Sequence, residues 1–238
     1  MSTAGDLLPV AILMGGLATR LGPLTLSLPK ALVPVGGRPF VFRQLDFLRG
    51  QGVRRVVLCI GHFGGQIRAA VGDGSAFGLD VRYSDDGPQR LGTAGAVRRA
   101  LPLLGPEFFV LYGDSYLPVD FAAIREAYKK SGLPALMTVF RNAGRWDASN
   151  VRCADGHVVL YDKRSPKPDM HYIDYGLSVL SSAALAGVAL DEPADLGDVF
   201  HALSLCGHLA AFEVSTRFYE IGSPAGLHEA EQYFTHKG

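Results

Sequence analysis

The sequence has little of what marks membrane, secreted and nucleic-acid-binding proteins. No apolar run approaches the roughly 20 residues that cross a bilayer, and the first residues lack the basic region of a signal peptide. The 3 cysteines, Cys59, Cys153 and Cys206, are far apart and odd in number, which argues against a disulfide framework. Lys plus Arg and Asp plus Glu each number 23, which argues against a broad basic surface for nucleic acid. We therefore predict a cytoplasmic protein with neither a membrane nor a nucleic-acid partner.

Two common phosphate-binding motifs are also absent. A P-loop needs glycine, a short spacer and then Gly-Lys-Ser/Thr, and no such run occurs. The dinucleotide fingerprint G-x-G-x-x-G is missing as well, and the chain has no internal repeats. Any phosphate site must therefore depend on a different loop and on locally placed charges.

A glycine-rich loop after the first apolar run is the strongest signal in the chain. Residues 10–14 predict a short buried strand, and Gly15 and Gly16 follow it directly. Because glycine has no side chain, this pair lets a phosphate or a base approach the backbone. Arg20 and Lys30 add a planar fork and a mobile point charge, a combination suited to a polyphosphate. A plain surface turn is the alternative, but glycines and cations in this order favour phosphate binding.

The rhythm of apolar runs predicts an α/β fold. In the first half, strand-like runs alternate with helix-like segments, which implies right-handed crossovers and a mainly parallel sheet. The second half has more strand-like runs, including a hairpin around the turn at residues 154–156. The expected strands are residues 10–14, 53–60, 79–83, 108–112, 135–140, 150–153, 157–161, 172–180 and 207–214. The expected helices are residues 40–51, 65–71, 93–101, 121–131 and 224–234. We predict one domain over residues 1–238, with halves that meet near residue 114.

Residues 15–39 resemble the signature of the nucleotide-diphospho-sugar pyrophosphorylases, the sugar-1-phosphate nucleotidyltransferases, which reads approximately GGxGTRLxPLTxxxPKxLxPVxGxP. The clearest departure is Ala18, where the family usually has glycine. The resemblance implies a Rossmann-like three-layer αβα fold with a mainly parallel, mixed central sheet. It also implies transfer of a nucleotidyl group from a nucleoside triphosphate to a sugar 1-phosphate, with release of pyrophosphate. Arg20 and Lys30 would be the catalytic cations. The nucleotide contacts of this loop would be Met14, Gly15, Gly16 and Thr19.

A second segment, residues 91–96, resembles the part of the family that recognises the base. Gly92 would approach the base, Thr93 would start a helix, and Gln89 offers both a donor and an acceptor to a base edge. The glycine pair and this segment look most like small guanylyltransferases for mannose or heptose 1-phosphate, which favours GTP. A uridylyltransferase for N-acetylmuramate 1-phosphate is the alternative, and a CTP enzyme with a phosphocholine-type acceptor is a more distant one.

Two acidic residues are candidate ligands for Mg²⁺. Asp114 follows the apolar run at residues 108–112, and the end of a parallel strand is where open α/β sheets bind ligands. Glu220 takes the place of an aspartate in the family's late DxG(S/T)P motif. A structural role is the alternative for Glu220, since Ser223 and Pro224 form a typical helix start. This substitution also keeps open a catalytically silent, nucleotide-sugar-binding regulatory subunit.

The second half resembles the sugar-binding part of the family. Asp162 and Lys163 match an acidic-Lys segment, in which the lysine grips the sugar phosphate and the acid binds a sugar hydroxyl. Residues 172–176 match the strand "(I/V)NAG(I/V)", with Asp174 in place of asparagine and Tyr175 in place of alanine. The implied sugar-phosphate contacts are Asn150, Asp162, Lys163, Asp174 and Gly176. A solvated, charged hairpin end is the alternative for Asp162 and Lys163. No hexapeptide repeats follow, so we expect no C-terminal β-helix domain, and a homo-oligomer is left open.

Overall fold

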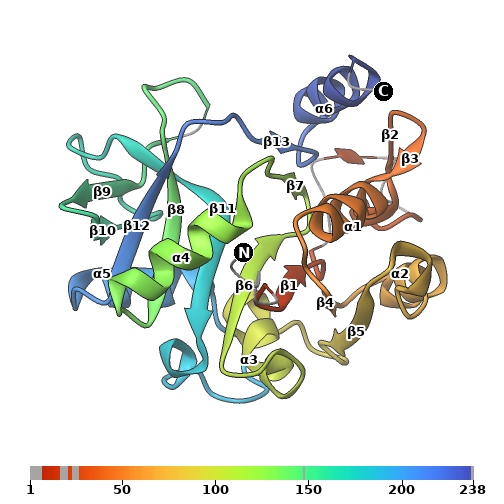
Figure 1. Cartoon of the computed structure of the whole chain (residues 1–238), viewed down its shortest axis with the longest axis horizontal. Coiled ribbons are helices and arrows are strands. Elements are labelled where there is room, and N and C mark those ends of the chain that lie inside the picture. Colours follow the sequence, from red (N-terminus) through yellow and green to blue (C-terminus); the bar gives the residue numbers. More distant parts are fainter. Residues whose placement is uncertain (1–6, 17–20, 23–26, 147, 237–238) are drawn as a thin grey trace, which may run out of the picture.

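A computed structural model describes residues 7–16, 21–22, 27–146 and 148–236, and its centre is a nine-stranded mixed sheet (Figure 1). The strand order is β5-β4-β1-β6-β11-β8-β12-β10-β9. The first four strands of this order are parallel to one another. They are β5 (Asp80–Asp85), β4 (Arg55–Ile60), β1 (Val10–Leu13) and β6 (Glu107–Tyr112). The predicted parallel half of the sheet is therefore confirmed.

The later strands continue the same sheet, and four of the neighbouring pairs in its strand order are antiparallel. Strand β11 (Tyr172–Ser181) pairs antiparallel with β6 and with β8 (Ala135–Arg141), so it joins the two halves of the chain. Strand β12 (Leu209–Val214) is parallel to β8, and the hairpin of β9 (Val151–Ala154) and β10 (His157–Tyr161) closes the edge. The predicted mixture of mainly parallel and some antiparallel strands is confirmed.

Helices cover both faces of the sheet because its buried strands alternate their side chains. In β1, Val10 and Ile12 belong to a core shared with three helices, whereas Ala11 belongs to a core on the opposite face. The first core includes side chains of α1 (Phe40–Gly50), α2 (Gly64–Val71) and α4 (Phe121–Ser131). The second includes α3 (Gly92–Leu104), α5 (Leu196–Leu205) and the 3-10 helix η4 (Ser182–Leu185). The expected three-layer arrangement follows.

One helix of this arrangement, α5, was not expected from the sequence. Gly197 in its first turn weakens the helical signal. The signal that reveals it is Asp195 as N-cap, followed by Leu196, Val199 and Phe200 at helical spacing. None of the helices within the described residues is long and apolar enough to span a bilayer.

Short strands bring the end of the chain back to the centre. Strand β7 (Ser115–Tyr116), just after β6, pairs with β13 (Tyr219–Glu220), with Glu220 opposite Ser115. The last helix, α6 (Pro224–His236), begins at the predicted proline, and Ser223 Oγ caps it by accepting from the Gly226 N–H at 3.1 Å. The remaining short elements lie in the first half of the chain. They are the ribbon of β2 (Pro34–Val35) and β3 (Arg38–Pro39) and the 3-10 helices η2 (Lys30–Leu32) and η3 (Ser75–Phe77).

Candidate active site

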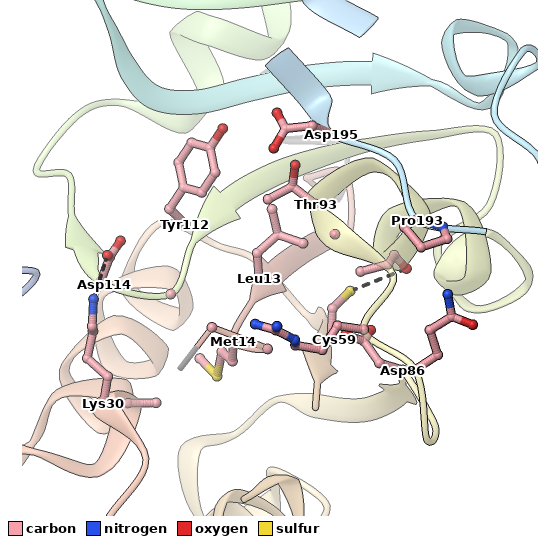
Figure 2. Close-up of a pocket in the computed structure, with 18 residues that line it drawn as sticks. Leu13, Met14, Lys30, Cys59, Asp86, Thr93, Tyr112, Asp114, Pro193 and Asp195 are labelled. Atoms are coloured by element: carbon pink, nitrogen blue, oxygen red, sulfur yellow. Dashed lines mark hydrogen bonds and ion pairs between the residues drawn. The ribbon is translucent and has the colours of Figure 1, made fainter. Parts of the chain in front are cut away.

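A cavity of about 650 Å³ lies at the carboxyl ends of the parallel strands, where open α/β sheets bind ligands (Figure 2). It collects residues from six separate parts of the sequence. The lining residues are Leu13, Met14, Gly15, Gly16, Lys30, Ala31, Cys59, Asp86, Gln89, Arg90, Gly92, Thr93, Ala96, Tyr112, Gly113, Asp114, Pro193 and Asp195. All the predicted nucleotide contacts except Thr19 are among them. Thr19 and Arg20 lie outside the described residues.

The end of β1 is packed so tightly that it requires glycine. A Cβ at Gly15 would lie 3.1 Å from Asp86 Oδ2, and one at Gly113 would lie 2.5 Å from the Leu13 carbonyl oxygen. By contrast, a Cβ at Gly16 would meet nothing within 4 Å. Glycine is thus required at Gly113, and Gly15 packs closely against the Asp86 carboxylate. The open space at Gly16 is what a close-approaching phosphate or base requires.

Lys30 and Asp114 form an ion pair at one end of the cavity. Lys30 Nζ lies 3.1 Å from Asp114 Oδ2, and the two side chains are 17% and 31% exposed (Figure 2). Lys30 comes from η2, and Asp114 follows β6, so two distant segments supply the pair. The predicted catalytic lysine and the predicted metal ligand therefore meet in one place.

Glu220 approaches the same place from the end of the chain. A Cβ at Gly222 would lie 2.4 Å from Glu220 Oε2 and 3.6 Å from Asp114 Oδ2, so both carboxylates border one space that only glycine leaves open. The Glu220 carboxylate also accepts from the Gly222 N–H and the Ser223 hydroxyl. Within the described residues, no three histidine, cysteine, aspartate or glutamate side chains converge on one point. Two converging carboxylates beside the cavity fit Mg²⁺, which takes few protein ligands and keeps several waters.

The other end of the cavity contains a carboxylate that the sequence did not reveal. Asp86 follows β5 and is only 7% exposed, and burial raises the pKa of its carboxyl group above the usual range, against a lowering by a backbone hydrogen bond from Leu91. Gln89, which was expected to read the base, lines the same cavity but is exposed. Cys59 lies behind them, and burial raises the pKa of its thiol to about 12, so this cysteine is unreactive at neutral pH.

Gly92 and Thr93 line the cavity, but both also contact the segment before α5, so each has a structural role as well. Gly92 has a φ of +69°, and a Cβ there would lie 2.5 Å from the Ala194 carbonyl oxygen. Thr93 Oγ1 accepts from the Leu196 N–H at 2.7 Å, so it caps α5 from a neighbouring helix. The Ala194 N–H in turn donates to the Leu91 carbonyl at 2.9 Å. These bonds fix the segment before α5 onto the start of α3.

The predicted sugar-phosphate residues form a second group beside the cavity. The Asp174 N–H donates to Asn150 Oδ1 at 3.3 Å, and the Asp162 N–H donates to the Asn150 carbonyl at 2.9 Å. Asp174 Oδ1 accepts from the Gly176 N–H at 2.9 Å, and the Lys163 charge lowers the pKa of Asp174, although burial dominates and raises it. Asp162 Oδ1, however, accepts from two backbone N–H groups of its own turn. Asn150 and Gly176 therefore hold the backbone and the carboxylate of Asp174, and Lys163 acts on that carboxylate by its charge. Asp162 instead caps its own turn.

Tyr112 stands between this group and the cavity. A Cβ at Gly176 would lie 3.5 Å from Tyr112 Cδ2, so the tyrosine ring packs directly over that glycine of β11. Tyr112 also lines the cavity, on the side of Asp195 (Figure 2). The Tyr112 ring therefore connects the cavity with the predicted sugar-phosphate residues.

Asp174→Asn is expected to stabilise the protein in a pH-dependent way. Burial raises the pKa of Asp174 from 3.8 to about 6, so the charged form is disfavoured in the folded state. The penalty is absent near pH 4, grows between pH 4 and 6 and is complete above that range. Asparagine keeps an acceptor for the Gly176 N–H without the charge. The free energy of unfolding of the Asp174→Asn variant at pH 8 should therefore exceed that of wild type by on the order of 2–3 kcal/mol.

Urea denaturation of both proteins between pH 4 and pH 8 measures this gain. Asp155→Asn, at an exposed turn, is the matched control and should change stability little at any pH. A difference between wild type and Asp174→Asn that does not change with pH would contradict the assignment.

Comparison with known proteins shows which family this chain resembles. The nucleotidyl transferase family pattern matches residues 10–146. The chain is 29% identical to N-acetylmuramate alpha-1-phosphate uridylyltransferase of Neisseria meningitidis, over 92% of this chain and 95% of that protein. It is also 29% identical to mannose-1-phosphate guanyltransferase of Aspergillus fumigatus over 90% of its own length, but it spans only 60% of that protein.

A solved structure is similar over the whole chain. The crystal structure of HddC from Yersinia pseudotuberculosis complexed with GMP-PN has a TM-score of 0.78 and 25% identity, and the match covers 96% of this chain and 100% of that one. The fold expected from the signature is therefore confirmed. Because the family pattern covers more than half of the sequence, the chain belongs to the nucleotidyl transferase family and is an enzyme.

Proposed function

We propose that this enzyme is a sugar-1-phosphate nucleotidyltransferase that uses GTP. The observation that supports GTP is the buried carboxylate of Asp86 at the base end of the cavity. Guanine presents two adjacent donors, N1–H and the N2 amino group, and a carboxylate can accept from both. Uracil and thymine present one N–H between two carbonyl oxygens, which a carboxylate repels. The Yersinia structure with GMP-PN agrees with a guanine nucleotide, and a hexose or heptose 1-phosphate is the acceptor we favour.

The cations and carboxylates named above, with Arg20 of the signature loop, suggest how the reaction proceeds. A phosphate oxygen of the sugar 1-phosphate attacks the α-phosphorus of the triphosphate, and pyrophosphate leaves. The attacking phosphate is already an anion at neutral pH, so no general base is needed, and positioning and charge neutralisation dominate. Lys30 stabilises the α-phosphoryl group, Arg20 neutralises the pyrophosphate, and Lys163 aligns the acceptor phosphate. Asp114 and Glu220 would hold Mg²⁺, which when bound neutralises phosphate charge.

A uridylyltransferase remains the second candidate, because the chain spans 95% of the Neisseria uridylyltransferase. A silent regulatory subunit is less well supported. Such a protein would be expected to lose a phosphate-binding charge, and here Lys30 and Asp114 are both present and in contact inside the cavity.

Pyrophosphate release with each nucleoside triphosphate and a panel of sugar 1-phosphates tests the proposal. GTP should give the highest kcat/KM. Asp86→Asn should lower kcat/KM for GTP by about 10-fold to 100-fold, which corresponds to roughly 1–3 kcal/mol for a paired base contact. UTP should lose less, because an amide can donate to a carbonyl oxygen and accept from N3–H.

Asp85→Asn is the matched control, because Asp85 is the exposed neighbour and its Oδ1 only caps a turn at the Gly87 N–H. It should leave the order of nucleotides unchanged. Equal losses for all four triphosphates in Asp86→Asn, or a wild type that prefers UTP, would contradict the assignment of GTP.

A further inference from the structure

One carboxylate in the cavity has no role in the reaction described so far. Asp195 lies just before α5 and is the N-cap of that helix, with Oδ1 accepting from the Gly197 N–H at 2.6 Å. Among the described residues, its other oxygen, Oδ2, has no hydrogen-bond partner, and the side chain is exposed in the cavity. Capping needs only one oxygen, so the second is available to a ligand.

Tyr112 lies on the same side of the cavity as Asp195. Figure 2 places the Tyr112 ring and the Asp195 carboxylate along one edge, with Thr93 beneath them, while Lys30 and Asp114 lie to one side and Asp86 lies at the opposite end. Burial raises the pKa of the Tyr112 phenol well above its usual range, and the carboxylates of Asp174, Asp195 and Asp114 raise it further. Tyr112 is therefore a neutral hydroxyl at any pH at which the enzyme works.

The chemistry of this edge differs from that of the rest of the cavity. The Asp195 carboxylate offers only acceptors and repels a phosphate, whereas the neutral Tyr112 phenol offers one O–H donor and an acceptor. The phosphates have a cation at Lys30, and the base has the buried carboxylate of Asp86. A neutral group rich in hydroxyls is what remains for the edge at Tyr112 and Asp195, because a carboxylate oxygen accepts strongly from O–H donors.

Two parts of the substrates carry such hydroxyls, the ribose and the ring of the acceptor sugar. The position of Tyr112 favours the acceptor. Its ring packs over Gly176, on the side of the predicted sugar-phosphate residues Asp174 and Lys163. We propose that Asp195 and Tyr112 bind hydroxyl groups of the acceptor sugar ring and set which sugar 1-phosphate the enzyme accepts. This inference rests on the proposed function.

The capping role of Asp195 and its role in binding can be separated. Asp195→Asn keeps an oxygen for the Gly197 N–H, and Thr93 still caps the Leu196 N–H, so the helix start stays intact. The change replaces the second acceptor by a donor. Asp120 of α4 is a matched control, since it too is an N-cap aspartate, accepting from the Ala122 and Ala123 N–H groups, and it does not line the cavity.

The test measures kcat/KM for the best sugar 1-phosphate and for each of its monodeoxy analogues, in wild type, Asp195→Asn, Tyr112→Phe and Asp120→Asn. We expect wild type to reject at least one monodeoxy sugar, because a missing hydroxyl leaves the site's polar groups unpaired. We define the rejection ratio as kcat/KM for the parent sugar 1-phosphate divided by kcat/KM for a monodeoxy analogue. Asp195→Asn and Tyr112→Phe should each reduce one of these ratios by about tenfold or more. Asp120→Asn should not change any ratio. The KM for the triphosphate should stay the same in all variants.

Three results would overturn the inference. Rejection ratios in Asp195→Asn that match those of Asp120→Asn would reduce Asp195 to a helix cap. A change in the discrimination against 2′-deoxy or 3′-deoxy triphosphates, with the sugar ratios unaltered, would assign the pair to the ribose. Equal affinity of wild type and Asp195→Asn for the sugar 1-phosphate, measured by titration calorimetry, would show without relying on turnover that Asp195 does not bind the acceptor. A wild type that transfers to no sugar 1-phosphate would instead refute the proposed function.

Discussion

Lys30→Ala is expected to abolish most of the turnover and to leave the fold intact. The side chain lies at the cavity surface and pairs with Asp114, so its loss removes a charge from the phosphates without opening a hole in the core. Removal of one charge-assisted contact from the transition state should raise the barrier by roughly 3–4 kcal/mol, or about 10²–10³ in kcat. The unpaired Asp114 would add repulsion towards the triphosphate. The same loss is expected for Arg20→Ala, in the signature loop.

Pyrophosphate release and thermal unfolding, measured on the same samples, separate chemistry from folding. Lys129→Ala, on the exposed side of α4, is the control and should retain wild-type turnover. Lys30→Arg keeps the charge and should lose less than Lys30→Ala. Near-normal turnover in a well-folded Lys30→Ala protein would refute the assignment of the catalytic cation.

Asp114→Asn is expected to be the most damaging change at the predicted metal site. We expect activity to require a divalent cation and to disappear when a chelator is added. Asp114→Asn loses the carboxylate shared by Lys30 and by the predicted ion, so a loss of more than about 100-fold is expected. Glu220→Asp keeps a carboxylate and should lose much less. It gives up the turn contacts to Gly222 and Ser223, so its unfolding temperature should fall slightly.

The rate of each variant measured against Mg²⁺ concentration gives the apparent affinity for the ion. Titration of the nucleotide-free protein with Mn²⁺, followed by electron paramagnetic resonance, gives a readout that does not depend on turnover. An unchanged wild-type rate in the presence of chelator would refute the metal assignment. Equal losses in Asp114→Asn and Glu220→Asp would contradict the order predicted here.

The sequence predicts the local parts of this protein well. The strands of the parallel half, the helix over residues 121–131 and the start of α6 at Pro224 depend on apolar spacing and on capping residues, both of which can be read along the chain. The sequence also assigns Lys30 and Asp114 to one site, because β1, which precedes the signature loop, and β6, which precedes Asp114, are parallel neighbours that end at the same edge of the sheet.

The residues that the sequence missed depend on contacts between distant segments. Asp86 stands in a polar, glycine-containing stretch, and only the packing of Gly15 against its carboxylate reveals that it is buried. Asp195 precedes helix α5, whose helical pattern is weakened by Gly197. More than a hundred residues separate Asp195 from the signature at residues 15–39. The spacing of apolar residues predicts helices and strands, but it does not predict which distant loops contact one another.

The hydrogen bonds between the start of α3 and the segment before α5 limit how this enzyme can be recombined with its relatives. The Leu91 carbonyl, Thr93 and Gly92 of one segment fit the Ala194 and Leu196 backbone of the other. A chimaera that exchanges only the first segment would place foreign side chains against this backbone, even where its base-binding residues are correct. We therefore expect productive crossover points between this enzyme and its relatives to lie outside both segments.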